Sequence, residues 1–357
     1  MTLRSERTRN ELIEPMTPVP PVTPQILCLG EILEDYLADQ MGSPLAHVKS
    51  WTAYPGGAPA NVACSLMKLG IPSAFIGCLG EDHAGRFLTN LLATLGVNLE
   101  GLQFQPYLPT RRVYVTRSLD GDRHFAGFGE MATTDFADTA LQASEIPESL
   151  FTKAQYLVLG TIPLAYPASR QAVKQAIAFA DHHQVAIFLD INWRPVFWPD
   201  PQAAWPLIAE IMPRINWLKC TDEEAQLFFH TTNPQTIRAT YPHLQGVLIT
   251  AGERGCHYQL GDYPGYVPAF DVSVVDTTGA GDAFVAGFLH QCFQWGSNVC
   301  MDPLLAQRAV IYASAVGALT TTHPGAIAID AAKLTSAQLT LETVQKFIQA
   351  NLESTVC

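Results

Sequence analysis

The stretch that decides the fold of this chain is Val274-Val275-Asp276-Thr277-Thr278-Gly279-Ala280-Gly281-Asp282-Ala283-Phe284. A β-branched run breaks there into a turn of small residues, and an apolar helical periodicity follows directly. The backbone N–H groups of Gly279 to Asp282 can therefore stay unpaired at a helix start, where exposed donors and the helix dipole both attract anions. The two glycines would let a phosphate approach the backbone closely.

Asp282 places a carboxylate beside this expected anion site. That placement is electrostatically unfavourable unless the carboxylate acts on a group next to the anion. Phosphoryl transfer needs one base that removes a hydroxyl proton beside a phosphate cradle, and Asp282 is a candidate for that base. From these residues alone, a helix cap after a glycine turn explains Asp282 equally well.

The composition is that of an ordinary globular chain with an acidic balance. The 357 residues are 48% hydrophobic and 15% charged, enough for one large domain with an insertion or for two domains. A net charge of −12 argues against a general nucleic-acid-binding surface. The eight cysteines form no C-x-x-C pair and no zinc-like spacing, which is typical of buried thiols in a reducing compartment. We therefore expect a cytoplasmic protein.

Residues 1–24 are expected to form a disordered tail. They combine Arg and Glu with five prolines and contain no apolar core. The segment therefore predicts neither a signal peptide nor a membrane segment.

Short apolar strands alternate with amphipathic helices along most of the remaining chain. Strands are predicted at 25–30, 73–80, 156–160, 185–190 and 246–250, and helices at 62–70, 86–95, 168–183 and 307–319. This alternation with short loops predicts a parallel sheet covered by helices on both faces. Ligands of such sheets bind at the carboxyl ends of the strands.

Residues 112–128 break the alternation. Two alternating strands flank the turn Asp120-Gly121, which predicts a hairpin with no helix attached. Together with residues 47–53 this hairpin would form a small sheet over the site. A lid that excludes water suits phosphoryl transfer, although an ordinary edge hairpin fits the pattern equally well.

Two strings of this chain resemble the signatures of the PfkB (ribokinase-like) carbohydrate kinases. Gly56-Gly57-Ala58-Pro59-Ala60-Asn61-Val62-Ala63 is similar to the first signature, and the run from Asp276 to Asp282 is similar to the second. The resemblance extends over about residues 25–329. Ribokinases usually carry Lys where this chain has Ala58, which favours a resemblance to the fructokinase and 2-keto-3-deoxygluconate kinase relatives.

The resemblance implies an α/β fold of the ribokinase-like type, with a central, mostly parallel sheet flanked by helices and a small β-sheet lid. The kinase domain would span residues 25–350, with lid segments at about 36–55 and 100–130. A homodimer formed through the lid is compatible with this organisation.

The resemblance also implies a set of site residues. Asp282 would be the general base, beside the amides of Gly279, Ala280 and Gly281. The residues expected to bind the sugar are Asp35, Gly56, Gly57, Asn61 and Arg194. Those expected to bind the nucleotide are Thr221, Glu224, Thr250, Gly252, Gly255 and Ser314. The implied cofactors are ATP and Mg²⁺, with Glu224 near the Mg²⁺ through water and with Asp276 and Thr278 as candidates for a K⁺ site.

Simpler explanations exist for several of these residues. Asp35 could be a solvated residue at a strand end, and Arg194 could form a structural salt bridge with Asp190 or with a carboxylate of the lid. Glu224 lies in the acidic first turn of a predicted helix, where carboxylates complement the helix dipole without any ligand.

The function expected from the resemblance is an ATP-dependent sugar kinase that converts fructose to fructose 6-phosphate. The same chemistry on 2-keto-3-deoxygluconate, another sugar, an inositol or a nucleoside stays open, because pocket residues decide the acceptor. Two departures from the family pattern, Thr221 in place of Asn and the absence of an Arg in residues 127–135, leave a non-catalytic scaffold as a third alternative. No Walker A string is present, and no G-x-G-x-x-G follows a strand.

Overall fold

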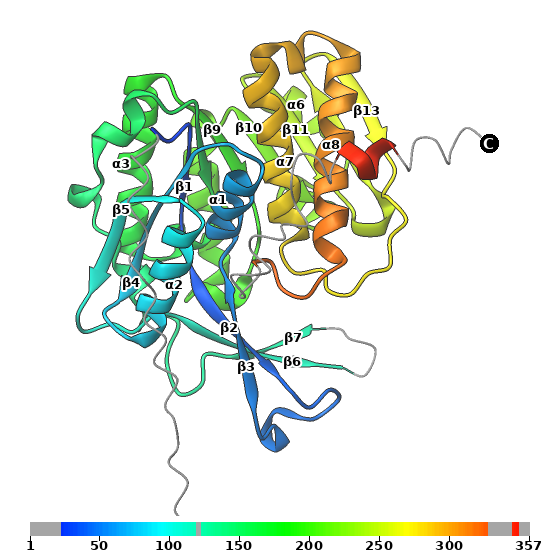
Figure 1. Cartoon of the computed structure of the whole chain (residues 1–357). Helices are drawn as coiled ribbons and strands as arrows, with labels where there is room; N and C mark the ends of the chain where they lie inside the picture. The colour runs from blue at the N-terminus through cyan, green and yellow to red at the C-terminus, as the bar shows by residue number, and fades with distance from the viewer. Residues whose placement is uncertain (1–22, 119–122, 328–344, 350–357) are drawn as a thin grey trace, which may run out of the picture.

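The computed structural model describes residues 23–118, 123–327 and 345–349. Within them, a nine-stranded sheet forms the centre of the protein (Figure 1). Its strands, in spatial order, are β13 (Tyr263–Val267), β12 (Cys256–Leu260), β11 (Gly246–Thr250), β10 (Trp217–Thr221), β9 (Ala186–Asp190), β8 (Tyr156–Leu159), β1 (Ile26–Leu29), β4 (Ser73–Gly80) and β5 (Asn98–Gln105). All neighbours from β11 to β5 pair in parallel, whereas β12 and β13 are antiparallel additions at one edge.

Helices cover both faces of this sheet because its strands are apolar on both sides. In β1, Leu27 and Leu29 belong to one buried core, and Ile26 and Cys28 belong to the other. The helices on the first face are α3 (Pro167–His183), α4 (Ala204–Ile211), α5 (Asp222–Phe229) and α6 (Pro234–Thr240). Those on the second face are α1 (Ala58–Lys68), α2 (His83–Thr94), α7 (Ala280–Trp295) and α8 (Pro303–Thr321). The predicted architecture, a mostly parallel sheet between two helical layers, is confirmed.

A second, four-stranded sheet projects from the main body (Figure 1). Its strands, in spatial order, are β3 (Trp51–Gly56), β2 (Leu33–Ala38), β6 (Arg112–Arg117) and β7 (Arg123–Gly127). Strands β6 and β7 are the hairpin expected from the sequence, and its turn lies outside the described residues. Residues 98–105, which overlap the start of the second expected lid segment, lie in β5 of the large sheet instead.

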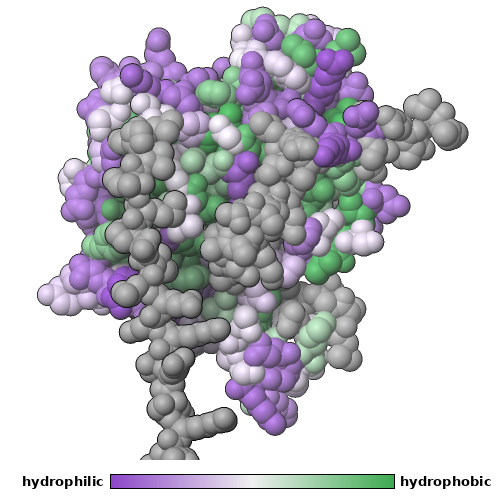
Figure 2. Space-filling view, viewed as in Figure 1, coloured by the Kyte–Doolittle hydropathy of each residue, from purple (hydrophilic) through white to green (hydrophobic). Residues whose placement is uncertain are grey.

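The hydropathy of the surface differs between the centre and the rim of the face shown in Figure 2. Hydrophobic residues reach the surface in the middle of the face shown, whereas hydrophilic residues cover most of its rim and the free end of the small sheet (Figure 2). Among the described helices, none is both long enough and apolar enough to cross a membrane.

The small sheet is attached to the main body through Arg111, the residue before β6. Its side chain is fully buried, and its Nε and Nη2 atoms donate to the Asp138 carboxylate at 2.7 and 2.9 Å. Nη2 also donates to the Tyr166 hydroxyl at 3.2 Å, and the guanidinium lies 4.5 Å from the centre of the Phe136 ring. A charge so enclosed is tolerated only because its donors are satisfied. Strand β6 therefore begins at a fixed point.

We predict that Arg111→Met lowers the free energy of unfolding by about 3–5 kcal/mol, because Asp138 is then left buried without its partner. Urea denaturation measures this loss. Lys174→Met is the matched control, since Lys174 forms a 2.6 Å pair with the half-exposed Glu210 and such pairs contribute only about 0–1 kcal/mol. Adding Asp138→Leu to Arg111→Met should restore part of the stability. Equal losses in the Arg111 and Lys174 variants would contradict this account.

Candidate active site

The centre of the candidate site is a hydrogen bond between two helices of the same sheet face. Asn61 in α1 donates its Nδ2–H to Asp282 Oδ2, in the first turn of α7, at 2.7 Å. The two residues are 221 positions apart in the sequence, and α1 packs against α7. The explanation of Asp282 as a simple helix cap does not fit, because this carboxylate bonds to the Asn61 amide and Gly279, the N-cap residue, has no side-chain cap.

The turn before α7 has the backbone geometry that an anion site needs. Gly279 has φ = 75°, a left-handed conformation, and a Cβ there would lie 2.4 Å from the Ala326 Cβ atom. The N–H groups of Gly281 and Asp282 lie in the first helical turn, where the helix supplies no acceptor. Ala280 differs from the prediction, because its N–H already donates to Thr277 O at 3.2 Å. Of the predicted amides, that of Ala280 is therefore already occupied.

A buried lysine lies directly beneath this turn. Lys219 in β10 and Asp190 in β9 are register partners on neighbouring parallel strands, and Lys219 Nζ bonds to both Asp190 oxygens at 3.0 and 3.1 Å. A Cβ on Gly281 would lie 3.1 Å from Lys219 Nζ, so this ammonium is close to the first turn of α7. Lys219 was not among the residues predicted for the site. The available signal was a lysine inside the otherwise apolar strand of residues 217–220.

The pKa values of Asp282 and Lys219 depend on burial and on the charged side chains around them. Burial raises the pKa of Asp282, against the effects of the Asn61 hydrogen bond and of the charges of Lys219 and Arg194. Burial by itself would lower the pKa of Lys219, but the neighbouring carboxylates, led by Asp190, raise it. The charged form of Lys219 is therefore favoured close to the first turn of α7, and Asp282 holds a proton more tightly than an exposed aspartate does.

The residues predicted to bind the sugar lie around the start of α1. A Cβ on Gly56 would lie 2.6 Å from Asp35 Oδ2, so the Asp35 carboxylate lies against this glycine. Gly57 has φ = 106°, and a Cβ there would lie 2.4 Å from Glu31 O, which no other residue type would tolerate. The chain therefore runs from Asp35, across the glycine pair, to Asn61 one turn into α1.

Arg194 is exposed and lies in the loop that follows β9. Its charge lowers the pKa of Asp282, against the larger effect of burial. The structural salt bridge considered for it, with Asp190, is not formed because Asp190 pairs with Lys219. Arg194 Nη1 donates to Trp193 O at 2.8 Å. Its guanidinium is thus positioned at the rim of the site.

The residues predicted to bind the nucleotide lie at the ends of β10 and β11. Thr221 and Thr250 are register partners at the carboxyl ends of these two strands. After β11 the chain turns through Gly252 and Gly255, with φ values of 55° and 83°. Ser314 lies farther away in the sequence, partly exposed on α8.

Glu224 is buried and already occupied by backbone donors. Its Oε2 accepts from Thr221 N at 2.8 Å, and Thr221 Oγ1 accepts from Glu224 N at 3.1 Å, which together form a capping box. Its Oε1 accepts from Trp193 N at 2.5 Å. These contacts indicate that Glu224 holds the loop that carries Arg194. They leave little capacity for Glu224 to bind Mg²⁺ directly, because both of its oxygens already accept backbone N–H groups.

The turn at Asp276 is joined to the loop after α8. Asp276 Oδ1 accepts from Thr278 N and Oγ1 at 3.0 and 2.7 Å, and Oδ2 accepts from Gly325 N at 2.8 Å. Asp276 therefore fixes the relative position of two loops beside the Gly279 turn.

The chain is similar to known proteins in both sequence and fold. The model of the pfkB family carbohydrate kinases matches residues 23–333. Probable fructokinase-5 of Arabidopsis thaliana is 36% identical over 308 residues, covering 85% of this chain and 94% of that protein. The crystal structure of a Xylella fastidiosa fructokinase with bound ATP superposes with a TM-score of 0.80 at 27% identity, covering 92% of this chain and 99% of the other. A Vibrio cholerae fructokinase in a fructose-, ADP- and calcium-bound form superposes with a TM-score of 0.77 at 28% identity, covering 91% and 99%.

The match to the family model covers most of the chain, and the two predicted signature strings meet at the Asn61–Asp282 contact. This chain belongs to the pfkB family of carbohydrate kinases.

Proposed function

We propose that this chain transfers the γ-phosphoryl group of ATP to the primary hydroxyl of D-fructose, giving fructose 6-phosphate and ADP. The observation that carries the proposal is the position of Asp282. It lies in the first turn of α7, and one of its oxygens is held by Asn61, which follows the glycine pair at the start of α1. The names of the most similar relatives support fructose as the acceptor.

In this mechanism Asp282 removes the hydroxyl proton as the sugar oxygen attacks the γ-phosphorus. The Asn61 amide fixes the orientation of the carboxylate, so that the second oxygen can face the sugar. Asp35 and the backbone at Gly56 and Gly57 hold the other hydroxyls. A single base of raised pKa is suited to this step, because the reaction requires one proton transfer and otherwise depends on positioning.

Negative charge on the transferring group is balanced by three features of the chain. The Gly281 and Asp282 amides and the α7 dipole face the phosphate, and the Lys219 ammonium lies beneath them. Arg194 adds a second cation at the rim, with a planar fork that suits oxyanions. The small sheet acts as a lid that keeps water from accepting the phosphoryl group.

Mg²⁺ would enter with the phosphates of ATP and neutralise their charge. Glu224 contacts it at most through water, because its oxygens already accept two backbone N–H groups. A K⁺ ion near Asp276 and Thr278 stays part of the proposal, supported by the joining of this turn to Gly325.

We predict that Asp282→Asn lowers kcat by about 10²–10⁴-fold, because the amide cannot accept the hydroxyl proton. The KM for fructose should change only a few-fold, since the side chain keeps its shape and the Asn61 contact can be retained. Steady-state assays with coupled detection of ADP measure both values. Asp262→Asn, on a carboxylate that is 92% exposed, is the control and should leave both unchanged. Turnover of Asp282→Asn within about tenfold of the wild type would remove Asp282 from the role of base.

The choice of acceptor is tested with a panel of sugars and nucleosides. We predict the highest kcat/KM for D-fructose, followed by lower values for 2-keto-3-deoxygluconate, ribose, myo-inositol and a purine nucleoside. Turnover of another panel member with no turnover of fructose would refute fructose and keep the kinase. The absence of any turnover, together with no binding of an ATP analogue in calorimetry, would favour the scaffold alternative.

Glu31 carries a buried proton next to this site. It is 3% exposed, its Oε1 accepts from Ala58 N at 3.0 Å, and its buried Oε2 has no hydrogen-bond partner within the part of the chain that the structure describes. Burial raises the pKa of Glu31 to about 8, helped by the charges of Asp138 and Asp282 and opposed by the Ala58 hydrogen bond. At neutral pH the side chain is therefore mostly the neutral acid.

This proton makes stability depend on pH. The folded pKa lies above the unfolded value, so the stabilising contribution is complete below about pH 4 and is lost as the pH rises towards about 8. The variant Glu31→Gln keeps a neutral acceptor for Ala58 N. We predict that its free energy of unfolding, relative to that of the wild type, rises by roughly 1 kcal/mol per pH unit between pH 5 and pH 8. Urea denaturation across this range measures the difference. Parallel stability curves for the two proteins would show that Glu31 is ionised in the folded chain.

Two further expectations extend the proposal. A homodimer through the small sheet is supported by the contacting, partly exposed rings of Tyr36, Trp51 and Tyr114. Sedimentation velocity that reports a monomer at all concentrations would exclude this dimer.

A cytoplasmic location is supported by the seven described cysteines, all of which are free thiols. Fractionation of cells that places the protein in another compartment would overturn it.

A further inference from the structure

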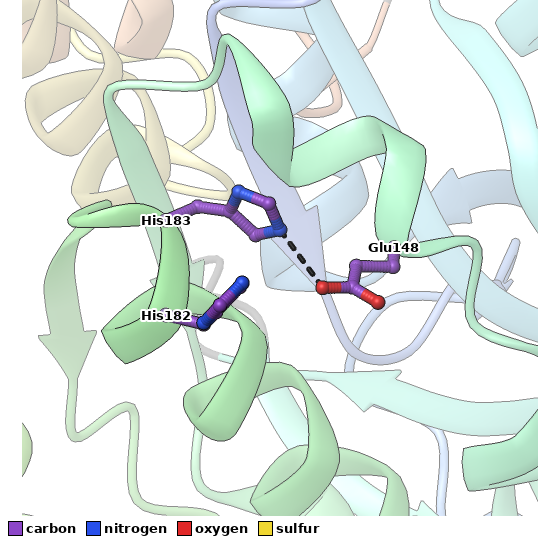
Figure 3. A group of neighbouring side chains, drawn as sticks. All are labelled: Glu148, His182 and His183. Atoms are coloured by element: carbon purple, nitrogen blue, oxygen red, sulfur yellow. Dashed lines mark hydrogen bonds and ion pairs between the residues drawn. The ribbon is translucent and has the colours of Figure 1, made fainter.

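Three metal-binding side chains meet on the surface, away from the residues used above. Glu148 begins the short 3₁₀ helix η4 (Glu148–Thr152), and His182 and His183 are the last two residues of α3. One ligand atom from each lies within 4.8 Å of the other two. Figure 3 shows both imidazole rings and the carboxylate gathered at the end of α3.

The contacts inside this group are already short. His183 Nε2 lies 2.9 Å from Glu148 Oε1, and the rings of His182 and His183 have their centres 4.7 Å apart with their planes near perpendicular. Within the described residues, the ion pair recorded for Glu148 is the one with His183, so no lysine or arginine competes for the carboxylate. A cation can therefore be accepted without breaking a stronger pair.

The group lies near the amino ends of the strands, whereas Asp282 lies near their carboxyl ends. Helix α3 ends just before β9 begins, and η4 precedes β8, so both segments lie at the amino ends of these strands. Asp190 and the proposed active site lie at the carboxyl ends, a strand length of about 15 Å away. A ligand at this group would not share the phosphate cradle.

The donor set matches one class of ion. Two imidazole nitrogens and one carboxylate oxygen suit Zn²⁺ and its transition-metal neighbours, with water in the remaining position, whereas Mg²⁺ and Ca²⁺ prefer oxygen ligands only. The C-terminal end of α3 carries the negative end of the helix dipole, which also favours a cation. Donor atoms around a tetrahedral Zn²⁺ are ~3.4 Å apart. The His183–Glu148 pair, at 2.9 Å, therefore needs to open by about 0.5 Å, and the other spacings, which are at most 4.8 Å, need to close by no more than about 1.4 Å. Exposure leaves the side chains room to make that change.

We propose that Glu148, His182 and His183 form a surface site for one divalent transition-metal ion, and that the bound ion joins the end of α3 to η4. The His183–Glu148 hydrogen bond is replaced by two bonds to the metal. His182 supplies the third protein ligand. The site ties together two segments that lead into neighbouring strands of the central sheet.

Calorimetric titration of the EDTA-treated full chain with ZnCl₂ tests the proposal. We expect one equivalent of Zn²⁺ to bind, with an affinity reduced at least tenfold in His182→Gln, in His183→Gln and in Glu148→Gln. Thermal unfolding of the wild type should shift upward by about 2–5 °C in saturating Zn²⁺, and each variant should lose this shift. Excess Mg²⁺ should neither compete nor reproduce it.

His47→Gln is the matched control, because His47 is exposed and lies in the small sheet connection, away from this group. It should bind Zn²⁺ as the wild type does. The proposal is overturned if the wild type binds no Zn²⁺, or if the His182 and His183 variants bind it with unchanged affinity. All readouts are binding and unfolding, so the result does not depend on the kinase activity.

Discussion

The hydrogen bond between Asn61 and Asp282 is the constraint on which the rest of the site depends. It is made between the first turns of α1 and α7, so it holds only if both helices start at fixed points on the sheet. Gly57 fixes the start of α1 by packing against the Glu31 carbonyl, and Gly279 fixes the start of α7 by packing against Ala326. Each glycine is in a conformation that a Cβ would prevent. Backbone geometry at both helix starts thus orients Asp282, the proposed base.

Several ionisable side chains lie near the Asn61–Asp282 hydrogen bond. Two buried acids, Glu31 and Asp190, lie near the partly buried Asp282, whose charge raises the pKa of both. The buried Lys219 pairs with Asp190. Burial raises the pKa of all three acids, and the pairing of Lys219 with Asp190 opposes this effect at Asp190. In the proposed mechanism, catalysis would draw on groups whose burial also affects stability.

Much of the fold could be predicted because it is encoded locally. Alternating apolar strands and helices, and the small-residue turn before α7, are visible in short windows of sequence. Lys219 and Arg111 were not predicted, since their roles depend on partners that only the register of β9 with β10 and the position of Asp138 provide. Glu224 shows the converse: the sequence predicted that it lies in the first turn of a helix, which the structure confirms, but its oxygens are bonded to the backbone of Thr221 and Trp193. Local patterns predict which residues reach the edge of the sheet, and tertiary contacts decide which atoms remain free to bind a ligand.

The most direct test of the central claim is a crystal structure of the chain with fructose and a non-hydrolysable ATP analogue. The account predicts that the free oxygen of Asp282 lies within hydrogen-bond distance of the primary hydroxyl, with Asn61 still bound to the other oxygen. The γ-phosphate should face the Gly281 and Asp282 amides above Lys219. A complex in which Asp282 points away from the sugar, or in which the phosphates lie elsewhere than the first turn of α7, would contradict it.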